Sequence, residues 1–270
     1  AGSTLVVDAL NLAFRWKHQG RTDFAADYIA TVQSLAQSYN CEKIIITADQ
    51  GSSSYRKNLD AGYKQNRKDK YAEQTEEEAE AFRKFFQEYE KTLVGLENQY
   101  PVLRYEGVEA DDIAAYITQH LDDYGLDECW MVSSDRDWDL LISDRVSRFS
   151  TVTRKEVTLD NWDEHYDFDV PDYITFKCLC GDKGDNVPGI PGIGPKRAVQ
   201  LMEQYGDVFD IYDACPIEGK YKFIQSLNEN AEQLLMNVEL MDLLTYSEQG
   251  VQNTEVINNT LKRHLNENRL

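Results

Sequence analysis

The sequence is poor in cysteine and in positive charge, and it contains no long apolar run. Its five cysteines are scattered, odd in number and without C-x-x-C spacing, which argues against a disulfide framework and against a structural zinc site. No apolar run reaches the length of a membrane span, and no secretory signal opens the chain. We therefore expect a reduced, cytoplasmic protein that does not contact a membrane.

Positive charge is scarce overall but concentrated in one place. The 28 lysines and arginines face 48 aspartates and glutamates, a net charge of −20, which by itself argues against binding nucleic-acid phosphates. Residues 56–70, however, hold six Lys or Arg against two Asp. Carboxylates that hold divalent cations would also be neutralised locally. The composition therefore leaves local contacts with nucleic acid open.

Apolar segments typical of strands alternate with segments of helical periodicity. The chain has 270 residues, 41% of them hydrophobic, which is enough to bury a large core. The alternation predicts an α/β fold in which helices cover both faces of a mostly parallel, twisted sheet. Strands are expected at 4–7, 43–48, 102–105 and 129–133 with an edge strand at 148–153, and helices at 9–16, 25–39, 76–96, 173–180 and 195–205.

Aspartates follow three of the predicted strands. Asp8, Asp49 and Asp135 each stand just beyond the carboxyl end of a strand. Ligands of open parallel sheets bind at that edge, whereas any one such aspartate could merely cap a turn or helix. The repetition on three strands favours a shared site.

Two sets of acids lie close together between residues 107 and 141. Glu109, Asp111 and Asp112 open a predicted helix, where the helix dipole alone could explain one or two of them. Asp137 follows Asp135 at an even spacing, which would direct both side chains the same way along an extended chain. Converging acids repel one another unless cations or protons lie between them. Oxygen-only ligands favour magnesium or manganese, so we interpret these acids as a divalent-metal site for phosphodiester cleavage.

An EF-hand calcium loop is the rival interpretation of the D-x-D-x-D run at 135–139. Leu140 occupies the position where that loop needs glycine, and Val146 the position of its bidentate glutamate. Only half of the motif is present, so we reject this interpretation.

Residues 54–70 interrupt the α/β pattern and indicate a long excursion from the body of the protein. They contain little apolar sequence and include Tyr63, Lys64 and Arg67. An aromatic ring beside paired cations suits a stacked base and a phosphate. We therefore expect this excursion to contact nucleic acid.

A Gly- and Pro-rich loop at 181–198 leads into a predicted helix. Gly192 and Gly194 would let the backbone approach a ligand closely, and amides at a helix start attract phosphate. Lys196 and Arg197 lie in the first turn, where the macrodipole disfavours cations, so an external anion would account for them. The same loop adds two carboxylates, Asp182 and Asp185.

Five motifs together resemble those of the 5′-nuclease superfamily. The chain is most similar to the stand-alone flap endonucleases, or 5′→3′ exodeoxyribonucleases, of large T-odd bacteriophages, and it also resembles the 5′-nuclease domain of bacterial DNA polymerase I. The resemblance covers essentially the whole chain. The motifs are V-V-D-A-L-N at 6–11, Y-K-Q-N-R at 63–67, G-V-E-A-D-D at 107–112, S-S-D-R-D-W-D at 133–139 and G-D-K-G-D-N-V-P-G-I-P-G-I-G-P-K-R at 181–197.

The resemblance implies a role for each matching residue. Lys64 and Arg67 would be catalytic cations in a helical arch, Tyr63 would stack on a base, and Arg15 would reach the substrate. Residues 181–197 would form a helix-three-turn-helix element that grips duplex phosphates through Gly192, Gly194, Lys196 and Arg197, with a potassium ion on its backbone carbonyls. The first metal site and its water shell would comprise Asp8, Asp49, Glu109, Asp111, Asp112 and Asp135, and the second Asp137, Asp182 and Asp185, with Asp135 shared or nearby.

The resemblance also implies an organisation and an activity. It implies a PIN-like core at 1–172 that includes the arch at about 54–96, a duplex-binding region at 173–227, and C-terminal helices at 228–270 packed on the core. Two Mg²⁺ ions, replaceable by Mn²⁺, would support cleavage of DNA at 5′ flaps, 5′ overhangs or junctions during replication, leaving a 5′-phosphate and a 3′-hydroxyl. We expect a monomer, in the host cytoplasm if a phage encodes it.

Two other classes of protein stay open on sequence alone. A PIN-type ribonuclease would share the acids at the strand ends but is usually smaller and lacks the duplex-binding element. A non-catalytic acidic protein that binds cations or DNA junctions would show the same charge pattern without releasing product.

Overall fold

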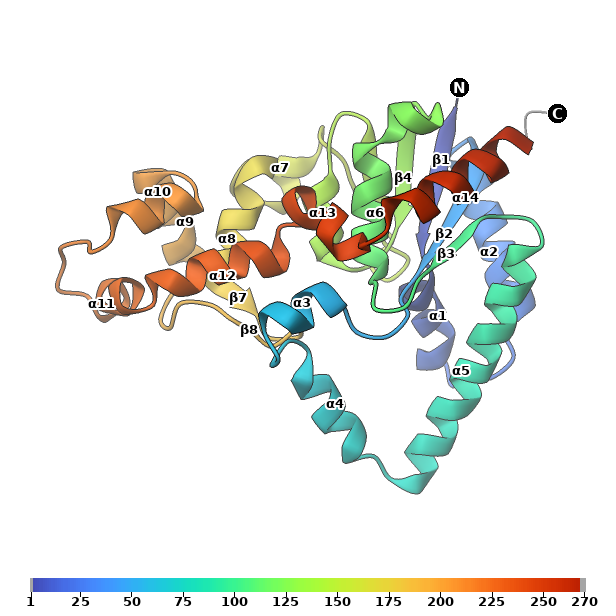
Figure 1. The fold of residues 1–270 in the computed structure, drawn as a ribbon, viewed down its shortest axis with the longest axis horizontal. Helices are drawn as coiled ribbons and strands as arrows, with labels where there is room; N and C mark the ends of the chain where they lie inside the picture. Colours follow the sequence, from blue (N-terminus) through green and yellow to red (C-terminus); the bar gives the residue numbers. More distant parts are fainter. Residues whose placement is uncertain (1, 268–270) are drawn as a thin grey trace.

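A six-stranded sheet forms the centre of the fold in the computed structural model, which describes residues 2–267 (Figure 1). The strand order is β3-β2-β1-β4-β5-β6, and every neighbouring pair is parallel except β5 and β6. The order places β2, β1 and β4 side by side. Because these strands are parallel, their carboxyl ends lie together at one end of the sheet. The strands are β1 (Ser3–Asp8), β2 (Cys41–Ala48), β3 (Val102–Arg104), β4 (Glu128–Val132), β5 (Val146–Phe149) and β6 (Glu156–Val157).

Successive residues of the central strands face opposite hydrophobic clusters. In β1, Val6 belongs to one cluster, whereas Leu5 and Val7 belong to the other. Ile45 and Ile46 of β2 divide in the same way. This is the two-residue period of a strand buried on both faces. The prediction of a sheet covered on both sides is confirmed.

Helices from distant parts of the sequence cover the two faces. One face packs against α1 (Ala9–His18), α2 (Ala25–Ser38) and α5 (Glu76–Glu97). The other face packs against α6 (Ala110–Gln119), α13 (Leu243–Val251) and α14 (Thr254–Glu267). The last helices thus return to the sheet (Figure 1).

A third hydrophobic cluster lies outside the sheet, in the helices that extend to the left of Figure 1. Leu179 and Leu201 belong to it, as do Leu234 and Val238 of the C-terminal region. The division at 172 and 227 stays a prediction. The helix α12, which belongs to the segment expected to pack on the core, packs instead with the predicted duplex-binding region. The helices are α8 (Tyr173–Cys180), α9 (Pro195–Tyr205), α10 (Val208–Ala214), α11 (Lys222–Glu229) and α12 (Ala231–Met241).

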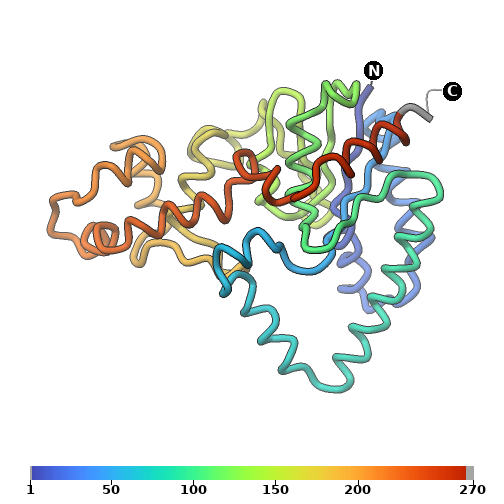
Figure 2. The backbone as a smooth tube through the Cα atoms, in the orientation of Figure 1, coloured from blue at the N-terminus to red at the C-terminus, as the bar shows by residue number. Residues whose placement is uncertain are grey.

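The excursion after β2 forms the first leg of an arch. It contains α3 (Ser54–Leu59) and α4 (Gln65–Ala72), and α5 returns from the tip to the body as the second leg (Figure 2). The hydroxyl of Thr75 caps α5 by accepting the amide of Glu78 at 3.1 Å, which fixes where the second leg begins. The legs diverge from a tip that lies away from the sheet.

The predicted strands and helices are present, with one correction at the edge of the sheet. The strand expected at 148–153 ends at Phe149, because the chain turns there and returns as the antiparallel β6. Within residues 2–267, no helix combines the length and the apolar character needed to cross a membrane.

Candidate metal centre

The three adjacent strands β2, β1 and β4 bring Asp49, Asp8 and Asp135 to one edge of the sheet. Asp8 is buried and accepts a hydrogen bond from the Ser133 hydroxyl at 2.7 Å. Burial raises its pKa well above the ordinary value, and the charge of Asp49 and that of Asp135 raise the pKa further. The expected convergence of the strand-end acids is therefore observed.

The N-terminus of α6 supplies acids to the same edge. Asp49 accepts the backbone amide of Ala110, so the end of β2 is joined to the start of the helix. Asp111 accepts a hydrogen bond from the Trp138 indole at 3.1 Å. Burial, followed by the charge of Asp135, raises the pKa of Asp111 well above its ordinary value. Neutral or cation-bound carboxylates are favoured here over free anions.

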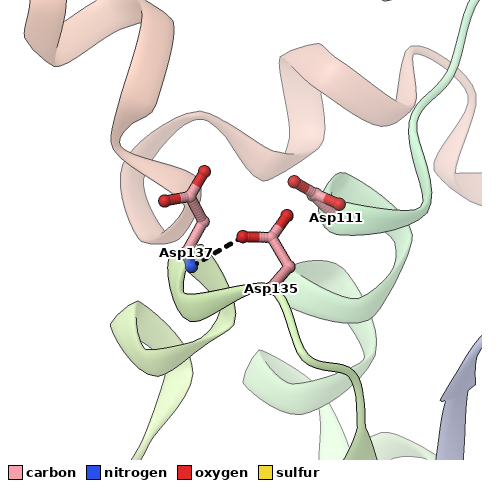
Figure 3. Close-up of side chains that lie close together, drawn as sticks. All are labelled: Asp111, Asp135 and Asp137. Atoms are coloured by element: carbon pink, nitrogen blue, oxygen red, sulfur yellow. Dashed lines mark hydrogen bonds between the residues drawn. The ribbon is translucent and has the colours of Figure 1, made fainter. Parts of the chain in front are cut away.

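Asp135 and Asp137 reach the site through a turn and not through an extended chain. A 3-10 helix begins at Arg136, and Asp135 caps it by accepting the amide of Asp137 at 2.9 Å (Figure 3). The condition of an extended chain is not met, yet Asp111, Asp135 and Asp137 each place a carboxylate oxygen within 4.8 Å of the others. Burial and the charge of Asp137 raise the pKa of Asp135 to about 7.

A second group of three acids shares Asp137. Oxygens of Asp137, Asp182 and Asp185 also lie within 4.8 Å of one another. Asp182 ends the short strand β7 (Gly181–Asp182) and accepts the amide of Asp185 at 3.1 Å, which orients the turn. Burial raises the pKa of Asp185 to about 6, although the charge of Lys64 opposes that rise. Asp137 thus belongs to both groups, and Asp135, which the resemblance gave as shared or nearby, lies beside it in the first group.

The donor set fits two divalent cations. Both groups offer only carboxylate oxygens, which are ligands that hard divalent cations prefer. A shared carboxylate between two groups is also the arrangement that lets one acid contact two ions. The first group would hold one cation and the second group the other, with Asp8, Asp49 and Glu109 surrounding the first.

The ammonium group of Lys177 neutralises part of this cluster. The ammonium of Lys177 contacts Asp137 and lies 3.8 Å from Asp182, although the side chain is only 8% exposed. Burial alone would lower the pKa of Lys177, but the charge of Asp137 and its hydrogen bond raise it. Lys177 was not among the residues predicted from the sequence. The only signal for it there is a single lysine within the apolar stretch of α8.

Asp112 stands apart from the cluster and requires a correction. Its two oxygens accept hydrogen bonds from the Arg56 guanidinium at 2.6 and 2.8 Å, and the carboxylate is fully buried. Both oxygens of Asp112 therefore already accept from Arg56, which argues against a direct metal ligand. Arg56 belongs to the basic stretch that the sequence identified, but its partner, 56 residues away, could not be read from spacing.

Tyr63 also requires a correction, because its side chain is buried. It is 3% exposed, and its hydroxyl donates to Glu109 at 2.8 Å, so the ring has no free face for a DNA base. Lys64 follows in a left-handed conformation, with φ of 55°, and its ammonium lies 2.6 Å from Glu109. The guanidinium of Arg67 lies 2.8 Å from Asp185. Lys64 also lies 3.9 Å from Asp185, so both predicted cations lie beside the second acid group.

Charge explains how Glu109 remains ionised in a buried position. Burial alone would raise its pKa, but the charges and hydrogen bonds of Lys64, Arg56 and Tyr63 together lower the pKa below its ordinary value. Burial alone would lower the pKa of Lys64, but the charges of Glu109 and Asp185 outweigh it and raise that pKa. The base of the arch is thus joined electrostatically to the start of α6.

The remaining predicted contacts lie outside the carboxylate groups. Gly192 has φ of 85°, in the left-handed region, and a side chain at Gly194 would meet open space. Lys196 is exposed, whereas the Arg197 guanidinium donates to the Gly192 carbonyl at 2.7 Å and lies 4.4 Å from the ring centre of Phe223. One of the hydrogen-bond donors of Arg197 is therefore already used within the protein.

Arg15 lines a separate cavity. This cavity of about 520 Å³ lies between α1, α2 and the turn after β5, and Arg21 and Arg154 also line it. Asp27 pairs with Arg21 at 2.6 Å. Three arginines in one concavity give this surface a local positive charge in an acidic protein.

Known proteins are similar to this chain in both sequence and fold. The family described as 5′-3′ exonuclease, N-terminal resolvase-like domain, matches residues 3–167, and the 5′-3′ exonuclease C-terminal SAM fold matches residues 169–263. The flap endonuclease of Escherichia phage T5 is 43% identical over 244 residues, which are 90% of this chain and 84% of that protein.

Solved structures agree with the sequence comparison. A phage T5 5′-exonuclease with bound zinc has a TM-score of 0.92 at 40% identity, over 98% of each chain. A T5 flap endonuclease in a pseudo-enzyme-product complex with DNA and metal ions also has a TM-score of 0.92, at 39% identity, over 99% of this chain and 100% of that one. The sequence match over most of the chain and the carboxylate groups at the sheet edge lead to one conclusion: the chain belongs to the 5′-3′ exonuclease family.

Proposed function

We propose that this protein is a structure-specific 5′-nuclease that hydrolyses DNA phosphodiesters at junctions between single strand and duplex, and from 5′ ends, during DNA replication. The observation that carries the proposal is the pair of carboxylate groups sharing Asp137, with Lys64 and Arg67 of the arch beside Asp185 of the second group. Such a site can hold two divalent cations on one scissile phosphate. The relatives named flap endonuclease and 5′-exonuclease support the same activity.

Two magnesium ions, or manganese in their place, would occupy the two groups. When bound, such cations lower the pKa of a bound water and stabilise charge on the attacking and leaving oxygens, so the products would carry a 5′-phosphate and a 3′-hydroxyl. Asp111, Asp135 and Asp137 would hold one ion, and Asp137, Asp182 and Asp185 the other. Oxygen-only donors support this choice of metal.

Lys64 and Arg67 would stabilise the negative charge that develops on the phosphate. Each now pairs with a carboxylate of the site, Glu109 and Asp185 respectively. Once cations neutralise those acids, the two side chains can turn to the phosphate without leaving a buried carboxylate unpaired. Fixed positive groups near developing charge are worth about a hundredfold or more in rate.

The loop at 181–197 and the start of α9 would hold the duplex arm. Gly192 and Gly194 leave the backbone open to a phosphate, and Lys196 extends a positive charge beside it. The same loop could carry a potassium ion on its carbonyls. Replacing KCl with NaCl at equal ionic strength tests this, since a potassium site predicts weaker duplex binding in sodium.

Cleavage of a 5′-labelled flap substrate tests the whole proposal. We expect a short labelled product in Mg²⁺ or Mn²⁺, cut near the junction, and none in EDTA. Matched RNA and DNA flaps distinguish a ribonuclease of related fold, which would prefer RNA. Binding without product in either metal would show instead a non-catalytic junction-binding protein. The monomeric state and the cytoplasmic location stay predictions.

A further inference from the structure

The guanidinium of Arg56 joins three elements at the point where the arch leaves the body of the protein. Arg56 lies in α3 and is 3% exposed. Its two terminal nitrogens donate to the two oxygens of Asp112 in α6, at 2.6 and 2.8 Å. Its Nε donates to the carbonyl of Leu240, near the end of α12, at 2.6 Å. One planar side chain thus connects the arch, the metal-binding helix and the C-terminal helices.

Close packing seals the Asp112 side of this contact. Asp112 is fully buried, and α13 approaches it at Gly250, where an added Cβ would lie 2.3 Å from the Asp112 Cγ. A side chain at residue 250 would therefore collide with the carboxylate. Within residues 2–267, the side-chain hydrogen bonds of Asp112 come from Arg56. Asp112 serves as a partner for arginine and not as a ligand for metal.

Arg56 also lies beside the residues that orient Lys64. Its guanidinium is 3.6 Å from Glu109 Oε1 and 5.9 Å from the centre of the Tyr63 ring. Tyr63 and Lys64 both bond to Glu109, at 2.8 and 2.6 Å. The turn that carries Lys64 is therefore bonded to Glu109, and the guanidinium of Arg56 is bonded to Asp112, at the first turn of α6. We call the bidentate contact between Arg56 and Asp112 the fork.

The Arg56–Asp112 pair differs from the other ion pairs between the first leg of the arch and the body. Lys64 pairs with Glu109, and Arg67 pairs with Asp185. Both of these carboxylates belong to the metal centre. Those pairs must loosen if cations occupy the site. Asp112 lies outside the two acid groups, so the fork can persist when metal and DNA bind.

We propose that Arg56 is a positioning residue: through its fork on Asp112 it fixes the base of the arch, so that Lys64 stays aimed at the scissile phosphate after its own carboxylate partner has bound metal. This inference rests on the proposed nuclease function. It predicts that the rate contribution of Lys64 depends on an intact fork, although Arg56 itself touches neither metal nor DNA.

The test is a double variant that removes both charges, Arg56→Gln with Asp112→Asn. Either single change would leave a buried charge unpaired and could prevent folding, whereas the pair of changes leaves none. Single-turnover cleavage of a DNA flap would be measured in the wild type and the double variant, each with and without Lys64→Ala. Circular dichroism would confirm folding, and a Mg²⁺ titration of the rate would report metal affinity.

We expect the double variant to fold, to require the same Mg²⁺ concentration as the wild type, and to cleave about tenfold or more slowly, because small misplacements of catalytic groups are costly. Lys64→Ala should slow the wild type about a hundredfold but the double variant much less, because the two sites are coupled. A merely structural role would lower thermal stability without changing the effect of Lys64→Ala.

A matched control is available in the buried fork between Arg148 and Asp139. This pair is also bidentate, with one contact at 2.9 Å, and it joins β5 to the 3-10 helix that follows Asp135, away from β2 and β3, the strands on either side of the arch in the chain. Arg148→Gln with Asp139→Asn removes a comparable buried pair. Lys64→Ala should cost this variant as much as it costs the wild type.

The outcomes separate this inference from the proposed function. A wild type that fails to cleave flaps in Mg²⁺ would contradict the nuclease function itself. An active wild type whose Lys64→Ala effect is unchanged in the Arg56/Asp112 variant would overturn the positioning role. A large rise in the Mg²⁺ requirement of that variant would also overturn it, since Asp112 would then act on the metal.

Discussion

The raised pKa of Asp135 shows that the clustered carboxylates destabilise the metal-free protein near neutral pH. The pKa of Asp135 is 3.8 in an ordinary setting and about 7 in the fold, because burial and the charge of Asp137 favour the protonated form. The stability that this raised pKa contributes is complete below about pH 4 and is lost as the pH rises through about 7. We expect the melting temperature in EDTA to fall between pH 5 and pH 8, and Mg²⁺ to restore it.

Asp135→Asn isolates this contribution. The variant should melt at a higher temperature than the wild type in EDTA at pH 8, and Mg²⁺ should stabilise it less. Asp123→Asn, at an exposed acid, is the control and should leave both pH profiles unchanged. If the wild type keeps a constant melting temperature across this range in EDTA, the carboxylates do not repel one another as the geometry indicates.

At the scale of elements, α13 packs on α6 through a contact that only glycine permits. Replacing Gly250 with alanine would ordinarily stabilise a helix by about 1 kcal/mol. Here the new Cβ would lie 2.3 Å from the Asp112 carboxylate carbon, and overpacking of this kind costs about 1–3 kcal/mol. We expect Gly250→Ala to lower the urea midpoint of unfolding, because displacement of α13 outweighs the gain in helix propensity.

Gly194→Ala provides the contrasting case in the loop before α9. An added Cβ there meets no protein atom within 4 Å, so the urea midpoint should stay near that of the wild type. Duplex affinity should fall instead, because the methyl group would stand where a phosphate approaches. Equal destabilisation by the two substitutions would show that the packing at Gly250 is not special.

The elements are predictable from sequence wherever a local period determines them. Val6 and Val7 alternate between two hydrophobic clusters, and the apolar run that they belong to is enough to place Asp8 at a strand end. The partners of buried polar groups are not predictable in this way. Asp112 pairs with Arg56 and Tyr63 packs beneath Glu109 because tertiary contacts bring together residues that are more than forty positions apart.

The same limit applies to Lys177 and to the turn at Asp135. A lysine in an apolar helix signals a buried charge, yet only the fold shows that Asp137 receives it. The D-x-D spacing predicted that both aspartates share a site, but it suggested an extended chain where a 3-10 turn is observed. Spacing therefore predicted which acids come together better than it predicted their geometry.

For the whole molecule, the net charge of −20 opposes DNA binding, so affinity must come from a few local cations. Lys196 is exposed at the start of α9, where we place the duplex phosphates. Lys196→Ala should weaken duplex binding and reduce the slope of log Kd against log salt by about 1, as loss of one phosphate contact does. Fluorescence anisotropy in Ca²⁺, across a series of KCl concentrations, measures this slope.

A charge-matched control decides whether that effect is local. Lys262→Ala removes the same charge from α14, which covers the sheet far along the sequence from the loop, and it should leave the slope unchanged. If both variants reduce the slope equally, binding responds to total charge and not to a contact at α9. If neither does, the phosphates lie elsewhere, and the cavity around Arg15 becomes the surface to test next, because three arginines line it beside the end of β5.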